Sequence, residues 1–329
     1  LEACLAIADR IGSYQNVSRS LQGAIPGLTV TFSDGKPTRG ASFQVRGANS
    51  IGAGGSALIL VDGVETDITT VNSEDIESIS VLKDASSTAV YGSRGTFGVI
   101  LITTKRPEKG QMKITYNGSY NFYKRTVTPE LVDNGYDWTT SYLEAYTNSY
   151  ATDPTNINNV FRFSRAWYSE LERRNSDPSY EKWRINPADN RYEYFGNTNW
   201  YKIFYKDYTT GHQHNLSITG GTDKASYYVS GRFFHQDGIY NAGDERYNQY
   251  NVLAKGTVQA TKWLRVENTT SFMSRFSHQP TLTTGGQSFT VTPTRMMNHQ
   301  GFPMTLEKNP DGTWTDAAVY ICLLYTSDA

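Results

Sequence analysis

The stretch Asp75–Lys105 reads DIESISVLKDASSTAVYGSRGTFGVILITTK and combines the signals of a strand, a short helix, a tight turn and a second strand. Asp84 can accept hydrogen bonds from the first backbone N–H groups of a helix, so we expect it to cap a helix over Ala85–Tyr91. Gly92 can take positive φ and end that helix. Val99–Thr104 is apolar and too short for a membrane helix, which indicates a buried strand. Taken residue by residue, this is an ordinary buried α/β unit.

Composition favours a β-rich protein. The chain has 329 residues and a formal net charge of −1, so it has no overall field to recruit nucleic acid or an acidic surface. Aromatic residues make up 13%, and the 28 glycines suit turns between strands. The two cysteines, Cys4 and Cys322, cannot build a disulfide framework or a cysteine-based metal cluster. Such a composition excludes a disordered chain.

Membrane segments and chain ends set further bounds. No run reaches the roughly 18 apolar residues of a membrane helix, which excludes a helical membrane protein but not a membrane β-barrel. The chain begins at Leu1, and residues 321–329 change abruptly in character. We interpret the chain as a fragment and exclude its last nine residues, as a non-native tail, from fold reasoning.

Short strands and turns precede the opening stretch. Leu28–Phe32, Ser42–Arg46 and Ala57–Val61 have strand patterns, and Asp62-Gly63 predicts a tight turn after the third. Between the last two strands lies the glycine-rich segment Gly47–Gly55. A phosphate-binding loop would open a helix, but here a strand follows and no lysine is present. We therefore expect a mobile turn.

Five motifs follow one another over about residues 20–107: LQGAIPGLTV, FQVRGANS, LILVDGV, DIESISVLKDAS and YGSRGTFGVILITTK. In this order they resemble the plug domain of TonB-dependent outer-membrane receptors, in particular of the SusC/RagA family. The resemblance implies an α+β plug over residues 20–107, after a linker at 1–19. The first strands of an antiparallel transmembrane β-barrel would follow over residues 108–320. Family members usually also carry a signal peptide and a TonB box, which we do not find and ascribe to truncation.

Alternation along the chain tests this interpretation, because barrel residues point in turn to lipid and to the lumen. Five segments of about the length of a membrane strand alternate: Lys113–Phe122, Asn215–Gly220, Tyr227–Gln236, Asn248–Ala260 and Leu264–Met273. Phe234 and Leu253 break the pattern. A one-sided soluble sheet would alternate as well, so the pattern decides for a barrel only together with the plug.

The connections between these segments are unequal. Gly220–Ala225 and Thr261–Trp263 are short turns, whereas Lys124–Gly211 is long and contains a predicted helix over Gly135–Tyr146. Ser274–Ala318 is polar and indicates a second long loop. Short turns on one side and long loops on the other are typical of outer-membrane barrels. The long segments should then be extracellular.

Two sets of residues are candidates for contacts. The plug loops hold Arg46, Gly47, Asp62, Gly63, Tyr91, Gly92, Ser93, Arg94 and Gly95. The resemblance favours a role for Arg46 and Arg94 in pairing with acidic residues on the inner barrel wall, although both could be solvated surface residues. The long segment holds Trp138, Tyr142, Trp167, Trp183 and Trp200. These rings could stack on sugar faces, contact a lid protein, or pack the loop's own core.

Catalytic and metal chemistry find little support. His212 and His214 share one strand face and form a possible metal pair, but no third or fourth ligand lies nearby in the sequence. We find neither a nucleophile elbow nor a zinc-protease motif, and we predict no catalytic residues and no cofactor.

The resemblance implies a transporter in the outer membrane of a Gram-negative, Bacteroidetes-like cell. It would import a bulky nutrient, such as glycan or peptide fragments, with TonB supplying energy from the periplasm. A SusD-like surface lipoprotein would cover the outer mouth, and nucleic acid is not an expected partner. The alternative is a secreted or surface β-rich protein that binds carbohydrate or peptide without transport. A hydrolase ranks last because it lacks a motif.

Overall fold

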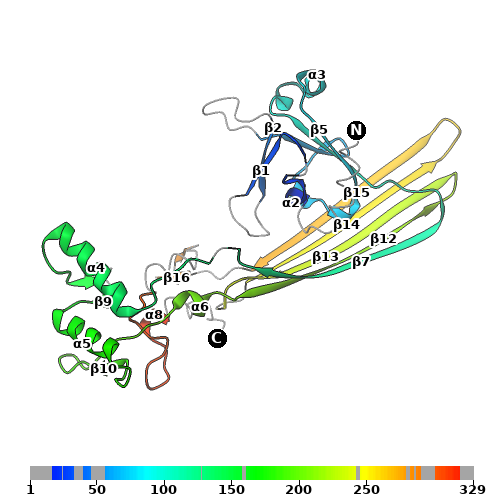
Figure 1. Ribbon diagram of the computed structural model, residues 1–329. Coiled ribbons are helices and arrows are strands. Elements are labelled where there is room, and N and C mark those ends of the chain that lie inside the picture. The colour runs from blue at the N-terminus through cyan, green and yellow to red at the C-terminus, as the bar shows by residue number, and fades with distance from the viewer. Residues whose placement is uncertain are drawn as a thin grey trace. The chain divides into compact units, whose positions relative to one another are not determined.

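The computed structural model describes residues 17–23, 25–32, 40–45, 56–126, 128–157, 161–241, 245–278, 282–284, 287–289 and 301–318. They belong to two compact units (Figure 1). Unit 1 lies within residues 1–121, 210–237 and 247–277, and unit 2 comprises the remaining segments. The predictions for Arg46 and Gly47, and for the mobile turn at 47–55, fall outside the described residues.

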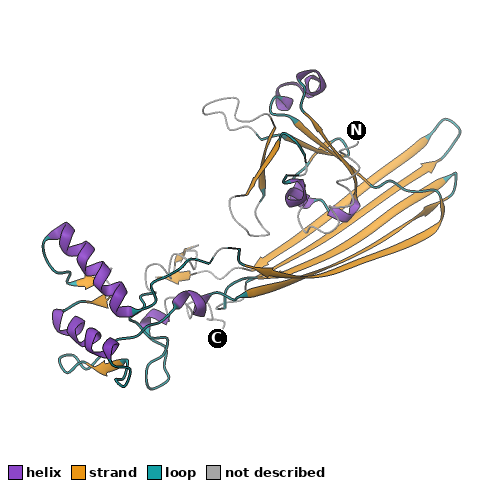
Figure 2. Ribbon diagram, in the orientation of Figure 1, coloured by secondary structure: helices purple, strands orange, loops and turns teal. Residues whose placement is uncertain are grey.

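Helices are short in unit 1 and longest in unit 2 (Figure 2). Among the described residues, no helix is both long and apolar enough to cross a membrane.

The plug in unit 1 is an α+β domain, as expected. Its elements are α2 (Val17–Leu21), β1 (Leu28–Phe32), β2 (Ala41–Val45), β3 (Leu58–Val61), β4 (Val64–Glu65), η1 (Ile68–Thr70), η2 (Ser73–Asp75), β5 (Ile76–Leu82), α3 (Ala85–Thr88), η3 (Ala89–Gly95) and β6 (Val99–Thr104). Strands β1 and β2 pair antiparallel, and the second sheet has the order β4-β3-β6-β5. β6 is central in it and buried, since Val99 and Ile100 are fully covered.

The predicted helix over Ala85–Tyr91 is shorter than expected. α3 ends at Thr88, and the chain continues as the 3₁₀ segment η3 to Gly95. Serine, threonine and Val90 are weak helix formers, which explains the early end. Gly92 takes φ 60°, as predicted, and interrupts η3.

A tight turn joins β3 to β4 at the predicted position. Asp62 and Gly63 have φ of 49° and 87°, the sign that a two-residue hairpin turn requires at both positions. β3 also pairs in parallel with β6, so the turn lies at the end of the central strands. This places the Asp62 side chain at one edge of the plug.

The five alternating segments form one sheet, the wall sheet. Its strands are β7 (Gly110–Lys124), β12 (Tyr208–Gly221), β13 (Ala225–Asp237), β14 (Arg246–Gln259) and β15 (Arg265–His278), in the order β15-β14-β13-β12-β7. β7, β12 and β13 extend beyond their predicted segments at both ends. β14 extends only at its start and ends one residue early, and β15 begins one residue late and extends only at its end. Neighbouring strands in the sheet follow one another along the chain, as in an up-and-down barrel wall. The sheet is not closed.

Unit 2 contains α4 (Gly135–Tyr150), β8 (Asn156–Ile157), β9 (Phe161–Arg162), α5 (Arg165–Ser176), β10 (Trp183–Ile185), β11 (Tyr192–Tyr194), α6 (Trp200–Phe204), β16 (Leu282–Thr284), β17 (Gln287–Phe289) and α8 (Asp316–Ala318). α4 begins at the predicted residue, where Asn134 caps it, and runs four residues further than expected. α5 was not predicted. Its signals were present, because Ser164 caps it and Trp167 and Leu171 lie one turn apart on its buried face.

Gly98 tests the packing of the plug. It has φ +94°, and a Cβ there would lie 2.7 Å from the Cβ of Val45. Gly63 has φ +87°, and a Cβ there would have no atom within 4 Å. Alanine at Gly63 would therefore suffer the backbone strain of positive φ but no steric clash. In the intact receptor in detergent, Gly63→Ala should cost about 1–2 kcal/mol of plug stability. Gly98→Ala should cost roughly 1–3 kcal/mol more from overpacking. Urea-dependent amide exchange of β6 measures both, and equal effects would contradict the close approach to Val45.

Candidate functional site

The wall sheet exposes its apolar face and buries polar side chains, the reverse of a sheet in a soluble protein. Apolar side chains lie on the exposed face, where Leu216 is 46% and Phe272 62% exposed. On the central strands β12, β13 and β14 the polar face is buried in the same unit as the plug, with Asn215, Arg232 and Lys255 at 3%, 4% and 9% exposure. A soluble sheet buries its apolar face instead. The candidate site is therefore the contact between the plug and the polar face of the wall sheet.

An ion pair joins the two parts. The Lys255 ammonium on β14 lies 2.9 Å from the Asp62 carboxylate in the β3–β4 turn. Asp62 also accepts hydrogen bonds from the backbone N–H of Thr104, at 2.9 Å, and from its hydroxyl, at 2.6 Å. Lys255 donates in addition to the Thr104 carbonyl at 3.2 Å. Because Lys255 is almost fully buried, its charge depends on these partners.

A second set of contacts runs along plug residues 69–75. Arg275 donates to the Thr69 hydroxyl at 3.1 Å, and Asn251 donates to the Thr70 carbonyl at 2.7 Å. Further along, the Asn72 amide donates to Asn215 at 2.9 Å, and the Tyr228 hydroxyl donates to the Asp75 carboxylate at 2.9 Å. Plug residues 69–75 thus present both backbone and side-chain groups to four strands of the wall, β12, β13, β14 and β15.

Arg94 differs from the expectation. Its guanidinium lies 2.9 Å from the carboxylate of Glu65, within the plug, and the two side chains are 69% and 59% exposed. An exposed pair of this kind contributes about 0–1 kcal/mol. In the structure the acid of the plug–wall ion pair belongs to the plug, in Asp62, and the base belongs to the wall, in Lys255.

The other predicted plug residues are structural neighbours of this contact. Gly63 forms the turn beside Asp62, and Tyr91 packs on the small cluster around Leu58 and Val99. In η3 the Ser93 carbonyl accepts the Thr96 hydroxyl at 2.7 Å. Gly95 is required by space, since a Cβ there would meet the Thr88 carbonyl at 2.7 Å. None of these side chains has a described bond to the wall.

Sequence reasoning missed most residues of the contact. Alternation correctly assigned Asn215, Tyr228, Asn251 and Lys255 to the polar strand faces, which was a usable signal for the wall side. On the plug side, Asn72 and Asp75 carried no distinguishing pattern. Phe234 and Leu253, which interrupt the polar faces in the sequence, are buried at 3% and 7% exposure. Phe234 lies beside Tyr247 and Arg232, with its ring centroid 5.7 Å from that of Tyr247.

The histidines do not form a metal centre in the part of the chain that the structure describes, where no group of three metal-ligating side chains occurs. His212 and His214 lie on the exposed face, with ring centroids 5.3 Å apart. Tyr116 stacks on His214, with their ring centroids 6.2 Å apart. These rings belong to an aromatic zone of the outer surface.

Unit 2 has its own core, and the predicted aromatic residues divide within it. Trp167 and Trp200 are 2% and 3% exposed and pack the interior of the unit. Trp183 is half-buried against Tyr192. Trp138 and Tyr142 are half-buried on the surface of the core. The prediction of ligand or lid contact is therefore without support for the two buried tryptophans.

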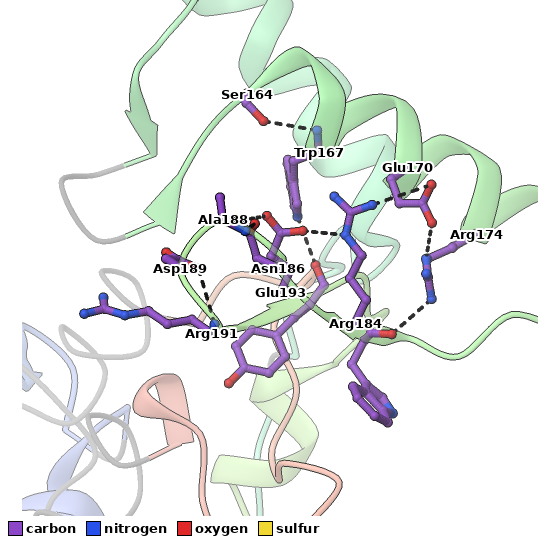
Figure 3. Close-up of polar contacts among 12 residues, drawn as sticks. Ser164, Trp167, Glu170, Arg174, Arg184, Asn186, Ala188, Asp189, Arg191 and Glu193 are labelled. Carbon is purple, nitrogen blue, oxygen red and sulfur yellow. Dashed lines mark hydrogen bonds and ion pairs between the residues drawn. The ribbon is translucent and has the colours of Figure 1, made fainter.

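An ion network holds unit 2 together (Figure 3). Glu170 on α5 accepts a hydrogen bond from Arg174 at 2.7 Å and lies 3.9 Å from Arg184 on β10. Arg184 donates in turn to Glu193 on β11 at 2.6 Å. Arg174 also donates to the Trp183 carbonyl at 3.0 Å. These bonds tie α5 to the β10–β11 hairpin, so this part of the long segment is a folded body.

Comparison with known proteins agrees with this geometry. The family model described as the TonB-dependent receptor plug domain matches residues 6–99. The TonB-dependent receptor P3 of Formosa agariphila is 32% identical over 260 residues, which cover 77% of this chain and 21% of that protein. The chain carries the plug and early barrel wall of a TonB-dependent receptor. It spans about a fifth of the length of that relative.

Two further similarities refine the family. The TonB-dependent receptor SusC of Bacteroides thetaiotaomicron is 43% identical over 124 residues, 34% of this chain and 12% of that protein. The solved RagAB peptide transporter superposes with a TM-score of 0.61 at 26% identity, over 82% of this chain and 30% of the other. These relatives are named as receptors and a transporter, not as enzymes.

A double-mutant cycle tests the Asp62–Lys255 pair in the intact receptor. Asp62→Asn should lower the stability of the plug–wall contact by about 1–3 kcal/mol, because it leaves a buried ammonium without its counter-charge. Lys255→Met should cost less, since Asp62 keeps its bonds to Thr104. The double variant should cost less than the sum. Amide exchange of Thr104 in urea measures each loss. As the control, Arg94→Ala should change stability by less than about 1 kcal/mol, and an effect equal to that of Asp62→Asn would contradict the assignment.

The same pair predicts an acid dependence. Burial alone would raise the pKa of the Asp62 carboxyl, but hydrogen bonds from Thr104 and Lys255 outweigh it, so the pKa lies below its ordinary value of 3.8. Its contribution to stability should be complete above the ordinary pKa and be lost as the pH falls through the lowered one. The difference in urea midpoint between the unaltered receptor and Asp62→Asn should shrink below about pH 4. A difference that stays constant to lower pH would contradict this.

Proposed function

We propose that the chain is part of an outer-membrane importer that carries a bulky nutrient, glycan or peptide fragments, into a Gram-negative, Bacteroidetes-like cell. The observation that carries the proposal is the inverted wall sheet. Its apolar face is exposed and its polar face meets the plug. Lipid would cover the first face, and the second would line the interior of the receptor.

The free energy of solvation separates this function from its alternative. A soluble binding protein would have to expose Ile114, Val252 and Phe272, at 57%, 46% and 62% exposure, to water. It would also have to bury Arg232 and Lys255. Burying apolar area contributes about 25 cal/mol per Å², and burying charge is costly unless it is paired. Lipid would cover the apolar face, and Asp62 and Gln213 pair the two buried charges. A soluble protein would instead need a second apolar layer over the exposed face.

Partners follow from the relatives and remain part of the proposal. TonB would engage the receptor from the periplasm, and a SusD-like surface lipoprotein would cover the outer mouth. The SusC relative and the RagAB peptide transporter support this arrangement for the whole protein. Opening would require the plug to leave or rearrange its contacts at Asp62 and residues 69–75, which is a two-state change driven from one side.

The direction of the strands supports an orientation. The Lys109 ammonium, where the chain leaves the plug, lies 3.2 Å from Asp223 in the β12–β13 turn. The Glu108 N–H donates to the Thr219 hydroxyl at 3.1 Å. The plug exit and the short turn therefore share one end of the wall sheet, and β7 leads away from it to the long segment. We infer that the short turn is periplasmic and that the segment from 125 to 207 is extracellular.

Cysteine labelling tests the orientation on whole cells. Asn148 on α4 and Asp223 in the short turn are both exposed. Asn148→Cys should react with a membrane-impermeant thiol reagent, and Asp223→Cys should react only after the outer membrane is opened. The unaltered receptor controls for Cys4 and Cys322. Labelling of Asp223→Cys but not Asn148→Cys on intact cells would reverse the orientation, and labelling of neither variant after opening would exclude exposure of both sites.

A further inference from the structure

Four aromatic residues of α4 recur at every fourth position and form a ladder: Trp138, Tyr142, Tyr146 and Tyr150. Successive ring centroids are 5.5, 6.0 and 4.7 Å apart. Trp138 also lies 5.3 Å from Phe302 in the core of unit 2, which anchors the ladder at one end. Side chains four residues apart share a helix face and rise about 6 Å per step. The ladder is therefore a regular row that runs outward from the core.

Packing explains only the first half of this row. Trp138 and Tyr142 lie against the core cluster of unit 2, but Tyr146 and Tyr150 do not belong to it. Tyr150 is 66% exposed. Pairs of rings along a helix contribute only about 0.2–0.5 kcal/mol each, so the outer two tyrosines add little to folding.

Three ladder residues carry a hydroxyl, Tyr142, Tyr146 and Tyr150. Among the described residues, none hydrogen-bonds to the hydroxyl of Tyr142, Tyr146 or Tyr150. Burial, and then the neighbouring hydroxyls of Tyr146 and Tyr150, raise the pKa of Tyr142 above its ordinary value of 10.0. A ligand that covered these hydroxyls would have to hydrogen-bond them, because buried polar groups without partners are costly.

The chemistry of the ladder selects among ligands. Asp137 and Glu144 are the only charged residues of α4, and both are acidic, so an anionic polymer has no cation to bind there. A peptide would find no sheet edge, since the helix satisfies its own backbone groups, and its N–H and C=O groups would remain unpaired. A neutral sugar chain has apolar ring faces that can stack on the aromatic rings of the ladder. Its hydroxyls can hydrogen-bond the tyrosine hydroxyls, and its short repeat suits the even spacing of the ladder.

We propose that the α4 ladder of Trp138, Tyr142, Tyr146 and Tyr150 is a binding site for an uncharged oligosaccharide laid along the helix. This deepens the proposed function, on which it rests for the extracellular position of α4. Trp138 and Tyr150 lie twelve positions apart, which is about 18 Å along the helix, so the site holds several sugar units rather than one.

Binding to the full receptor in detergent tests the ladder directly. The probes are linear neutral glucans with α-1,4, β-1,4 or β-1,3 linkages and β-1,4-mannans, from disaccharides to octasaccharides. Affinity for one series should rise with length and level off once the ladder is filled. Tyr146→Ala and Tyr150→Ala should each weaken binding about fivefold or more. The corresponding phenylalanine variants, which keep the ring, should lose less. Tyr180→Ala, an exposed tyrosine of unit 2 outside the ladder, should leave affinity unchanged.

Several outcomes would overturn the site. These are the absence of length-dependent binding in every series, binding that survives Tyr146→Ala and Tyr150→Ala together, or displacement of the sugar by mixed short peptides. Circular dichroism of each variant checks that the fold persists. Uptake of the bound sugar by cells with and without TonB separates the two proposals. Ladder-dependent binding without TonB-dependent uptake supports the site and contradicts import. TonB-dependent uptake that is unchanged in the ladder variants contradicts the proposed binding site but not the proposed import.

Discussion

The burial of a polar sheet face is the constraint on which unit 1 depends. Lys255 and Arg232 are almost fully covered, and neither can be stable there without partners. The plug supplies the partners of Lys255 through Asp62 and the backbone carbonyl of Thr104, whereas Arg232 donates to Gln213 of the wall itself. Conversely, the polar turns of the plug would lose hydrogen bonds without the wall. Each part therefore satisfies groups that the other part would otherwise leave unpaired.

This dependence has a consequence for mechanism. Hydrogen bonds and one ion pair hold the plug to the described wall, and such contacts can be exchanged for water at modest net cost. Apolar packing instead holds the plug's own sheet, through Val99, Ile100 and Ile102. The proposed shift of the plug would break these polar contacts and leave the apolar core of the plug's own sheet intact. Unit 2 also combines apolar packing with polar contacts. Its α5 packs in a hydrophobic core of its own, and an ion network links α5 to the β10–β11 hairpin.

Much of this was predictable, and the misses have physical causes. The order of plug strands, the Asp62-Gly63 turn and all five wall strands follow from local patterns, because alternation and turn chemistry act over a few residues. The resemblance favoured pairing of Arg94 with an acidic residue of the inner barrel wall, which the described strands do not test. In the structure, Arg94 pairs with Glu65, the second residue after the Asp62-Gly63 turn. α5 was overlooked because its apolar face is narrow, although Ser164 marks its start.

By itself, the sequence determined the family, the α+β plug, the two faces of each wall strand and the positive φ of Gly92. These depend on neighbouring residues, whose signals the chain carries in order. Only the tertiary structure decided that Asp62 meets Lys255, which lies 193 positions further along, and that Trp167 and Trp200 are core while Tyr150 is exposed. Such pairings depend on strand register and on which helix face meets the core, and no local pattern encodes either one.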